Sequence, residues 1–158
     1  MQYTLTDLLQ ADQIVLDLQA ADAEGVIRSL VDRLAANGAV TPAYADDVIA
    51  REQTFPTGLP TEPLAVAIPH ADPPQVLRSA IGLAVLAQPV AFGQMGTDGS
   101  TLVQTRLVFL LAIKEQEKQV EMIGQLIGAI QNPGLLEGLT QAASPAAALQ
   151  LIRETLQP

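Results

Sequence analysis

The sequence contains no cysteine and only one histidine among its 158 residues. Without cysteine, neither a disulfide framework nor a thiolate metal site can form. A single histidine is also a poor basis for zinc, which takes three or four protein ligands. We therefore expect no bound metal, and the lack of disulfides fits a reducing compartment.

Aromatic residues make up only 3% of the chain, while hydrophobic residues make up 49%. The core must therefore consist mainly of Ala, Val, Ile and Leu. The longest unbroken apolar run is 107–113, far short of the roughly 20 residues that a membrane-spanning helix needs. The N-terminus has Asp7 and no basic lead, unlike a secretion signal. These features together predict a cytoplasmic protein.

Basic residues are few and do not cluster, and the formal net charge is −9. A protein that binds nucleic acid normally presents a basic face, so we exclude that class. The acidity has two interpretations: it serves solubility, or it attracts a basic partner and repels anionic membranes. Both remain open from the sequence.

Apolar periodicity and turn residues predict strands that alternate with helices, as in a mixed α/β fold. Caps and first-turn prolines mark the helix starts at Asp22, Thr41-Pro42, Asn132-Pro133 and Ser144-Pro145. The predicted strands are 12–18, 64–68, 80–86 and 107–113, with a shorter edge-type strand at 89–92 that contains Pro89. The predicted helices cover 22–36, 41–52 and 117–130, and helices continue to the C-terminus. We expect a loop at 54–63, a helix end at Gly38, and Val120, Ile123, Ile127 and Ile130 on the inner face of 117–130.

His70 follows Pro69 at the end of the predicted strand 64–68. It could simply be a polar residue at the end of an element. No G-x-S-x-G elbow is present, which argues against a serine triad. A lone histidine does suit direct attack on phosphorus, because neutral imidazole is nucleophilic near pH 7 and needs no metal. We therefore expect His70 to accept a phosphoryl group.

Four residues in the stretch around His70 each have two interpretations, one as part of a phosphate site and one as an ordinary structural residue. Arg51 could bind phosphate oxygens with its guanidinium, or pair with Asp47 along its helix. Thr57-Gly58 could offer a hydroxyl and backbone N–H groups to a phosphate, or form an ordinary turn. Asp72 could orient the imidazole ring, or shape the turn before Pro73-Pro74.

The run Arg51-Glu52, Pro56-Thr57-Gly58 and Ala65 to His70 resembles the signature of enzyme IIA domains of the sugar phosphotransferase system (PTS), of the fructose–mannitol type. The pattern in that family is R-E, a short gap, T-G, and then A-[aliphatic]-P-H, with the histidine phosphorylated. The resemblance covers nearly the whole chain, which we expect to be a single domain, 1–158. The likeness is strongest to galactitol-type members.

Gln119 marks a departure from the mannitol and fructose types, which carry a second histidine at the matching position. Galactitol-type members resemble this chain in having glutamine there. An amide can donate to a phosphoryl oxygen but cannot carry positive charge, so neutralisation would depend more on Arg51. The plain alternative places Gln119 on the helix surface.

The resemblance implies a single mixed β-sheet of about five strands with helices on both faces. It implies that His70, through Nε2, accepts phosphate from the carrier protein HPr and passes it to a cysteine of an enzyme IIB, with a membrane IIC involved only indirectly. Arg51, Thr57 and Gln119 would hold the phosphoryl oxygens, and Glu52 would orient the guanidinium of Arg51. No cofactor is implied.

Two other functions remain compatible with the same residues. Some relatives are regulatory binding modules, in which the phosphorylation state of the histidine controls partner proteins. A third possibility is a remnant that keeps the fold without transfer, although the intact Arg51, Thr57-Gly58 and His70 argue against it.

Overall fold

The computed structural model describes residues 4–156, which form six helices, five strands and two short 3₁₀ turns. The helices are α1 (Leu5–Leu8), α2 (Ala23–Ala36), α3 (Tyr44–Thr54), α4 (Gln116–Ala129), α5 (Pro133–Gln141) and α6 (Pro145–Leu156). The strands are β1 (Ile14–Leu18), β2 (Gly58–Leu59), β3 (Ala65–Ala67), β4 (Ala80–Gly93) and β5 (Leu102–Ala112), and the 3₁₀ turns are Ala11–Gln13 and Pro73–Gln75.

The five strands form one mixed sheet in the order β1-β4-β5-β3-β2. β1 runs parallel to β4, and β3 runs parallel to β5. The central pair β4–β5 is antiparallel, as is the short pair β2–β3. The predicted fold class, a mixed sheet of about five strands with helices, is confirmed.

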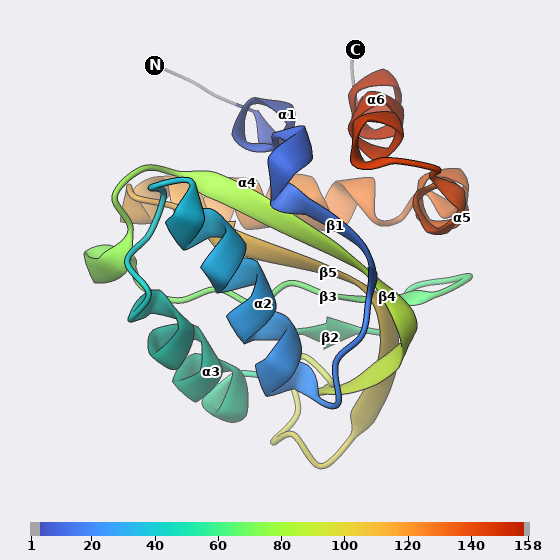
Figure 1. The fold of residues 1–158 in the computed structure, drawn as a ribbon. Helices are drawn as coiled ribbons and strands as arrows, with labels where there is room; N and C mark the ends of the chain where they lie inside the picture. The colour runs from blue at the N-terminus through green and yellow to red at the C-terminus, as the bar shows by residue number, and fades with distance from the viewer. Residues whose placement is uncertain (1–3, 157–158) are drawn as a thin grey trace.

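The sheet separates two hydrophobic cores (Figure 1). Helices α2 and α3 pack on one face, while α1, α4, α5 and α6 pack on the other. Because side chains alternate along a strand, neighbouring residues enter opposite cores. In β4, for example, Ile81 and Leu83 join the core under α4, and Ala80 and Ala84 join the core under α2. The helices therefore lie on both faces, as expected.

Small residues on the α2 side of β4 let that helix lie close to the sheet. A Cβ at Gly82 would stand 3.4 Å from Cδ2 of Leu30 in α2, which is contact distance. A larger side chain at Gly82 would push α2 away from the sheet. The aliphatic, aromatic-poor composition is thus matched to the narrow space between helix and sheet.

Most predicted helix ends are confirmed by their caps. Asp22 accepts a hydrogen bond from Gly25 N at 2.9 Å, and Asn132 accepts one from Leu135 N at 3.1 Å. Ser144 Oγ likewise accepts from Ala147 N at 3.0 Å. Gly38 follows α2 with a φ of 76°, a conformation that favours glycine.

The helix predicted from Thr41-Pro42 starts two residues later, at Tyr44, and continues to Thr54. Thr41 does not cap it, because its hydroxyl hydrogen-bonds the side chain of Gln75. The predicted loop 54–63 contains the two-residue strand β2, and the first helix, α1, was not predicted.

The separate edge-type strand predicted at 89–92 was wrong. Residues 80–93 form one long strand, and the pairing with β5 slips between Val85 and Val90. Pro89 lies within that irregular stretch, where no ladder hydrogen bond has to be donated. The chain therefore bends without ending the strand.

The predicted inner face of α4 was also partly wrong. Ile130 is buried, but Val120 is 76% exposed, and the buried residues of the helix are Gln119, Met122, Leu126 and Ala129. The helix is rotated so that a polar residue, Gln119, faces inward. No helix among residues 4–156 is long and apolar enough to cross a membrane.

Tyr44, at the start of α3, ties that helix to the sheet. Its side chain is fully buried, and its hydroxyl donates to the carbonyl oxygen of Leu111 at 2.8 Å. The Tyr44 hydroxyl oxygen also accepts a hydrogen bond from Ala71 N at 3.1 Å. Burial raises the pKa of Tyr44, so the hydroxyl stays protonated. It therefore bridges β5 and the residue that follows His70.

We expect Tyr44→Phe to lower the free energy of unfolding by about 1–3 kcal/mol, because two buried backbone groups would lose their partner. Urea unfolding would measure the change. Thr54→Val is a control, since the Thr54 hydroxyl is exposed and makes only a 3.4 Å contact with Ala50 O. Equal stability of Tyr44→Phe and the parent protein would contradict the bridging role.

Candidate functional site

His70 lies just beyond the C-terminal end of β3, beside β5. Leu111 N donates to the carbonyl oxygen of Pro69 at 3.1 Å, and His70 forms an isolated parallel bridge with Leu111. The backbone around the histidine is therefore held by the edge of the sheet. The residue is buried, with 8% of its surface exposed.

The imidazole ring is held by the chain's own backbone. Nδ1 lies 2.9 Å from the carbonyl oxygen of Ile68. A carbonyl oxygen can only accept, so Nδ1 must carry the proton and donate it. The neutral ring then has its lone pair on Nε2. The predicted reactive atom, Nε2, is the one that this tautomer leaves unprotonated.

Burial lowers the pKa of His70 below its ordinary value. The Ile68 carbonyl opposes this shift, the positive charge of Arg51 adds to it, and the negative charge of Asp72 opposes it. The sum favours the neutral, nucleophilic ring at pH 7. Asp72 is exposed and acts through its charge, while the ring hydrogen bond goes to Ile68. The interpretation of Asp72 as the orienting carboxylate was therefore wrong.

Arg51 lies in the last turn of α3, close enough to His70 for its charge to affect the ring. Its Cζ stands 5.1 Å from the centre of the Phe55 ring, as in a cation–π contact. Within residues 4–156, its buried Nε has no hydrogen-bond partner, and no ion pair joins it to Asp47. Among the described residues, no carboxylate forms an ion pair with the guanidinium.

Glu52 and Thr57 contact each other closely. Thr57 N donates to one Glu52 oxygen, and Thr57 Oγ1 donates to the other, both at 2.8 Å. Thr57 Oγ1 also accepts from Ile68 N at 3.2 Å. The single O–H of Thr57 is therefore already donated to Glu52, and both oxygens of Glu52 bind Thr57 where we had expected a contact with Arg51.

Gly58 has a packing role. It pairs with Ala67, and its carbonyl accepts from Met95 N at 2.8 Å. A Cβ there would come within 2.7 Å of the Gly93 carbonyl oxygen. Glycine is required because β2 and the end of β4 lie too close for a side chain.

Gln119 lies on the opposite side of the sheet from Arg51, in α4, and is 8% exposed. Its Nε2 donates to the carbonyl oxygen of Ala71 at 2.9 Å. The plain alternative, a glutamine on the helix surface, was therefore wrong. An amide nitrogen carries two N–H groups, so one remains after this hydrogen bond.

Two groups that support the site were not predicted: the Ile68 carbonyl and the Tyr44 hydroxyl. Backbone carbonyls carry no sequence signal, although a residue before proline is biased toward extended backbone conformations. Tyr44 was assigned to an apolar helix face. Its polar end was the available signal, because a buried tyrosine hydroxyl usually finds a partner.

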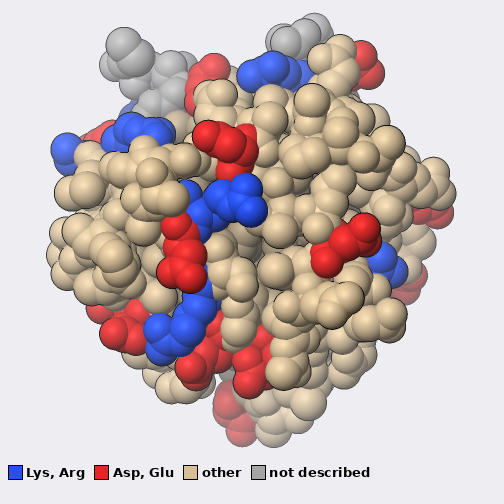
Figure 2. Space-filling view, in the orientation of Figure 1, with Lys and Arg blue, Asp and Glu red and all other residues tan. Residues whose placement is uncertain are grey.

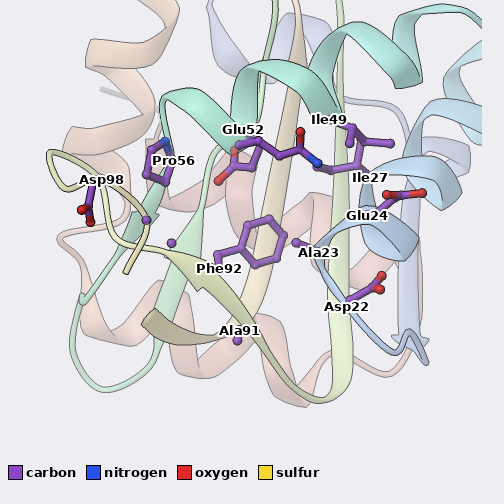
Figure 3. A pocket seen from close by; sticks show the side chains of 13 residues that line it. Asp22, Ala23, Glu24, Ile27, Ile49, Glu52, Pro56, Ala91, Phe92 and Asp98 are labelled. Carbon is purple, nitrogen blue, oxygen red and sulfur yellow. The ribbon is translucent and has the colours of Figure 1, made fainter. Parts of the chain in front are cut away.

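A cleft of about 400 Å³ opens between α2, α3 and the turn after β4 (Figure 3). Its lining includes four acidic residues, Asp22, Glu24, Glu52 and Asp98, and no lysine or arginine among the described residues. His70 and Arg51 do not line it. Its negative charge would repel a phosphoryl group, so this cleft is not a candidate phosphate site.

Charged side chains of both signs are interspersed on the face that α2 and α3 cover (Figure 2). Arg28, for example, pairs with Glu24 and Asp46. The described residues form no continuous basic patch on this face. Residues 4–156 also contain no group of three or more His, Asp or Glu side chains that could hold a metal ion.

The fold is that of solved PTS IIA domains. A Streptococcus pyogenes M1 GAS crystal structure assigned to these domains superimposes with a TM-score of 0.81 and 26% identity, covering 99% of this chain and 100% of that one. The complex of enzyme IIA and phosphorylated enzyme IIB for mannitol from Escherichia coli gives a TM-score of 0.74 and 27% identity, over 92% of this chain and 97% of that chain.

The sequence comparisons agree. The family model "Phosphoenolpyruvate-dependent sugar phosphotransferase system, EIIA 2" matches residues 7–155. The galactitol-specific EIIA component of Escherichia coli (strain K12) is 32% identical over 118 residues, which cover 75% of this chain and 77% of that relative. The chain belongs to the EIIA 2 family and is a IIA-type phosphotransferase component.

We expect His70 to titrate below its ordinary pKa of 6.5, so that the neutral ring persists as the pH falls past that value. Because this is the only histidine, an NMR titration of the ring measures it directly. Arg51→Gln should raise the pKa of His70 without restoring the ordinary value, since burial is the larger cause. Arg153→Gln, at an exposed position of α6, is the control. A pKa of 6.5 or above in the parent would mean that burial does not govern the ring.

Proposed function

We propose that this chain accepts a phosphoryl group from phosphorylated HPr on Nε2 of His70 and passes it to the cysteine of a cognate enzyme IIB. The observation that carries the proposal is the ring hydrogen bond to Ile68, which leaves the lone pair on Nε2. The lowered pKa supports it, because a protonated ring could not attack. Membership of the EIIA 2 family supplies the class of reaction.

Nε2 attacks the phosphorus atom in line, so that an N–P bond forms as the bond between phosphorus and HPr breaks and its electron pair stays with HPr. In the second step a cysteine thiolate of IIB attacks, an S–P bond forms, and the electron pair of the N–P bond returns to Nε2. Nδ1 keeps its proton throughout, because its partner carbonyl cannot take it.

Arg51 is the proposed main ligand of the phosphoryl oxygens, since its charge already acts on His70 and it forms no ion pair among residues 4–156. The second N–H of Gln119 provides a neutral contact from the opposite side. Thr57 is not part of this set, because its hydroxyl is already used.

The surface around His70 suits transient docking, first of HPr and then of enzyme IIB. Phe55, next to Arg51 in space, is 59% exposed, and Val120, next to Gln119, is 76% exposed. Exposed apolar groups on both sides of a reactive residue favour small, transient contacts. The 32% identity to the galactitol-specific component and the presence of Gln119 support a IIB of galactitol type.

His70 is tested by intact-mass measurement under non-acidic conditions after incubation with phosphoenolpyruvate, enzyme I and HPr. We expect the parent to gain one phosphoryl group and to lose it when a galactitol-type IIB is added. His70→Ala should gain none, and neither should the parent without HPr. A folded parent that gains no phosphoryl group would overturn the proposal.

Arg51 is tested by substitution with lysine, which keeps the charge but loses the planar fork. We expect transfer from phosphorylated HPr to slow at least about tenfold, which is less than the roughly 100-fold that losing an aligned donor outright costs, because lysine keeps the charge. The matched control is Arg153→Lys, in the exposed last turn of α6. Transfer at the parent rate in Arg51→Lys would remove the guanidinium from the mechanism.

A further inference from the structure

Three hydrogen bonds, joined through the backbone of Ile68, connect the ring of His70 to the carboxylate of Glu52. The ring Nδ1–H donates to Ile68 O at 2.9 Å, and Ile68 N donates to Thr57 Oγ1 at 3.2 Å. Thr57 Oγ1 in turn donates to Glu52 at 2.8 Å. Every donor points the same way, from the histidine toward the carboxylate.

The carboxylate of Glu52, at the far end of this series of hydrogen bonds, is itself held in place. Thr57 N donates to the second Glu52 oxygen at 2.8 Å, so both oxygens accept hydrogen bonds from one residue. Burial raises the pKa of Glu52, and the bonds from Thr57 and the charge of Arg51 oppose that rise. Thr57 is 3% exposed, so water does not compete freely for these contacts.

The backbone of Ile68 connects the pair Glu52–Thr57 to the imidazole ring of His70. Its side chain is fully buried, its N–H is held by Thr57, and its carbonyl is held against Nδ1. Pro69 follows it and restricts its backbone to extended conformations. With the N–H fixed and few conformations available, the direction of the carbonyl is fixed as well.

We infer that Glu52 and Thr57 are positioning residues for His70: they hold the backbone of Ile68 so that its carbonyl keeps the proton on Nδ1 and the lone pair on Nε2. This inference rests on the proposed role of His70 and replaces the contacts that we had expected for both residues. Neither residue touches the phosphoryl group. Their effect on transfer comes entirely through the tautomer and direction of the ring.

The test uses protein labelled with ¹⁵N in histidine, in which only His70 gives a ring signal. The two ring ¹⁵N shifts, measured where the ring is neutral, report which nitrogen carries the proton. The second measurement is the rate of transfer from phosphorylated HPr. Thr57→Val removes the hydroxyl with little change of shape, and Glu52→Gln removes the negative charge.

We expect Thr57→Val and Glu52→Gln to give a mixture of tautomers and to slow transfer about 10–100-fold, as when a supporting partner of a functional histidine is lost. Thr57→Ser keeps the hydroxyl and should retain the parent tautomer and a rate within about twofold. Thr54→Val and Glu137→Gln are matched controls at exposed positions. If Thr57→Val does not fold, Thr57→Ser and Glu52→Gln still decide the matter.

A folded Thr57→Val with the proton still on Nδ1 would overturn the inference, whatever its rate. A changed tautomer with unchanged transfer would overturn the claim that positioning matters for the reaction. A parent protein that accepts no phosphoryl group would instead defeat the proposed function, while the ¹⁵N measurement would still decide whether Thr57 and Glu52 hold the ring.

Discussion

The hydrogen bond from Nδ1 of His70 to the carbonyl oxygen of Ile68 is the contact on which the site depends. It decides which ring nitrogen faces outward with a lone pair, and it can form only while the backbone of residues 68–70 keeps its path beside β5. That path is maintained by Leu111 N, which donates to Pro69 O, and by Tyr44, which binds both Leu111 O and Ala71 N. The reactivity of one side chain thus depends on backbone geometry.

The fold brings the charge of Arg51 close to His70 from one face of the sheet and the amide of Gln119 to the neighbouring Ala71 from the other. Arg51 comes from α3, which packs on one face, and Gln119 comes from α4, which packs on the other. The end of β3 lies where the two layers meet, so a residue there can contact both. A histidine in the middle of a strand would face only one layer. The alternation of side chains between the two cores is therefore what makes this two-sided site possible.

Much of the architecture could be predicted because it follows from local patterns. The caps at Asp22, Asn132 and Ser144 and the helix end at Gly38 are signalled by single residues, and the structure confirms them. The joining of 80–86 and 89–92 into one strand could not be predicted. Proline at position 89 argues against a continuous strand unless the ladder slips there, and a slip depends on the partner strand.

Site residues could be named from the sequence, but their contacts could not. His70 stands out as the only histidine, and Arg51 stands out through the resemblance of its motif to that of enzyme IIA domains. Glu52 was assigned to Arg51 because the two are adjacent in sequence, yet neighbours on a helix do not face each other. Glu52 turns instead to Thr57, which the loop after α3 brings back to it. The sequence likewise did not show that Gln119 faces inward from α4. The burial of this polar side chain depends on a backbone partner, the carbonyl oxygen of Ala71.

A carbonyl in the position that we expected for a carboxylate has a chemical consequence. A carboxylate directly on Nδ1 would stabilise the imidazolium, raise the pKa of the ring and favour protonation of Nε2 over attack. The Ile68 carbonyl fixes the same tautomer with only a partial charge, and the buried charge of Glu52 stays two hydrogen bonds further away. The ring is therefore oriented while its pKa remains low. A carrier must both accept and release its group, and a nucleophile that is held in place without being made strongly basic suits both steps.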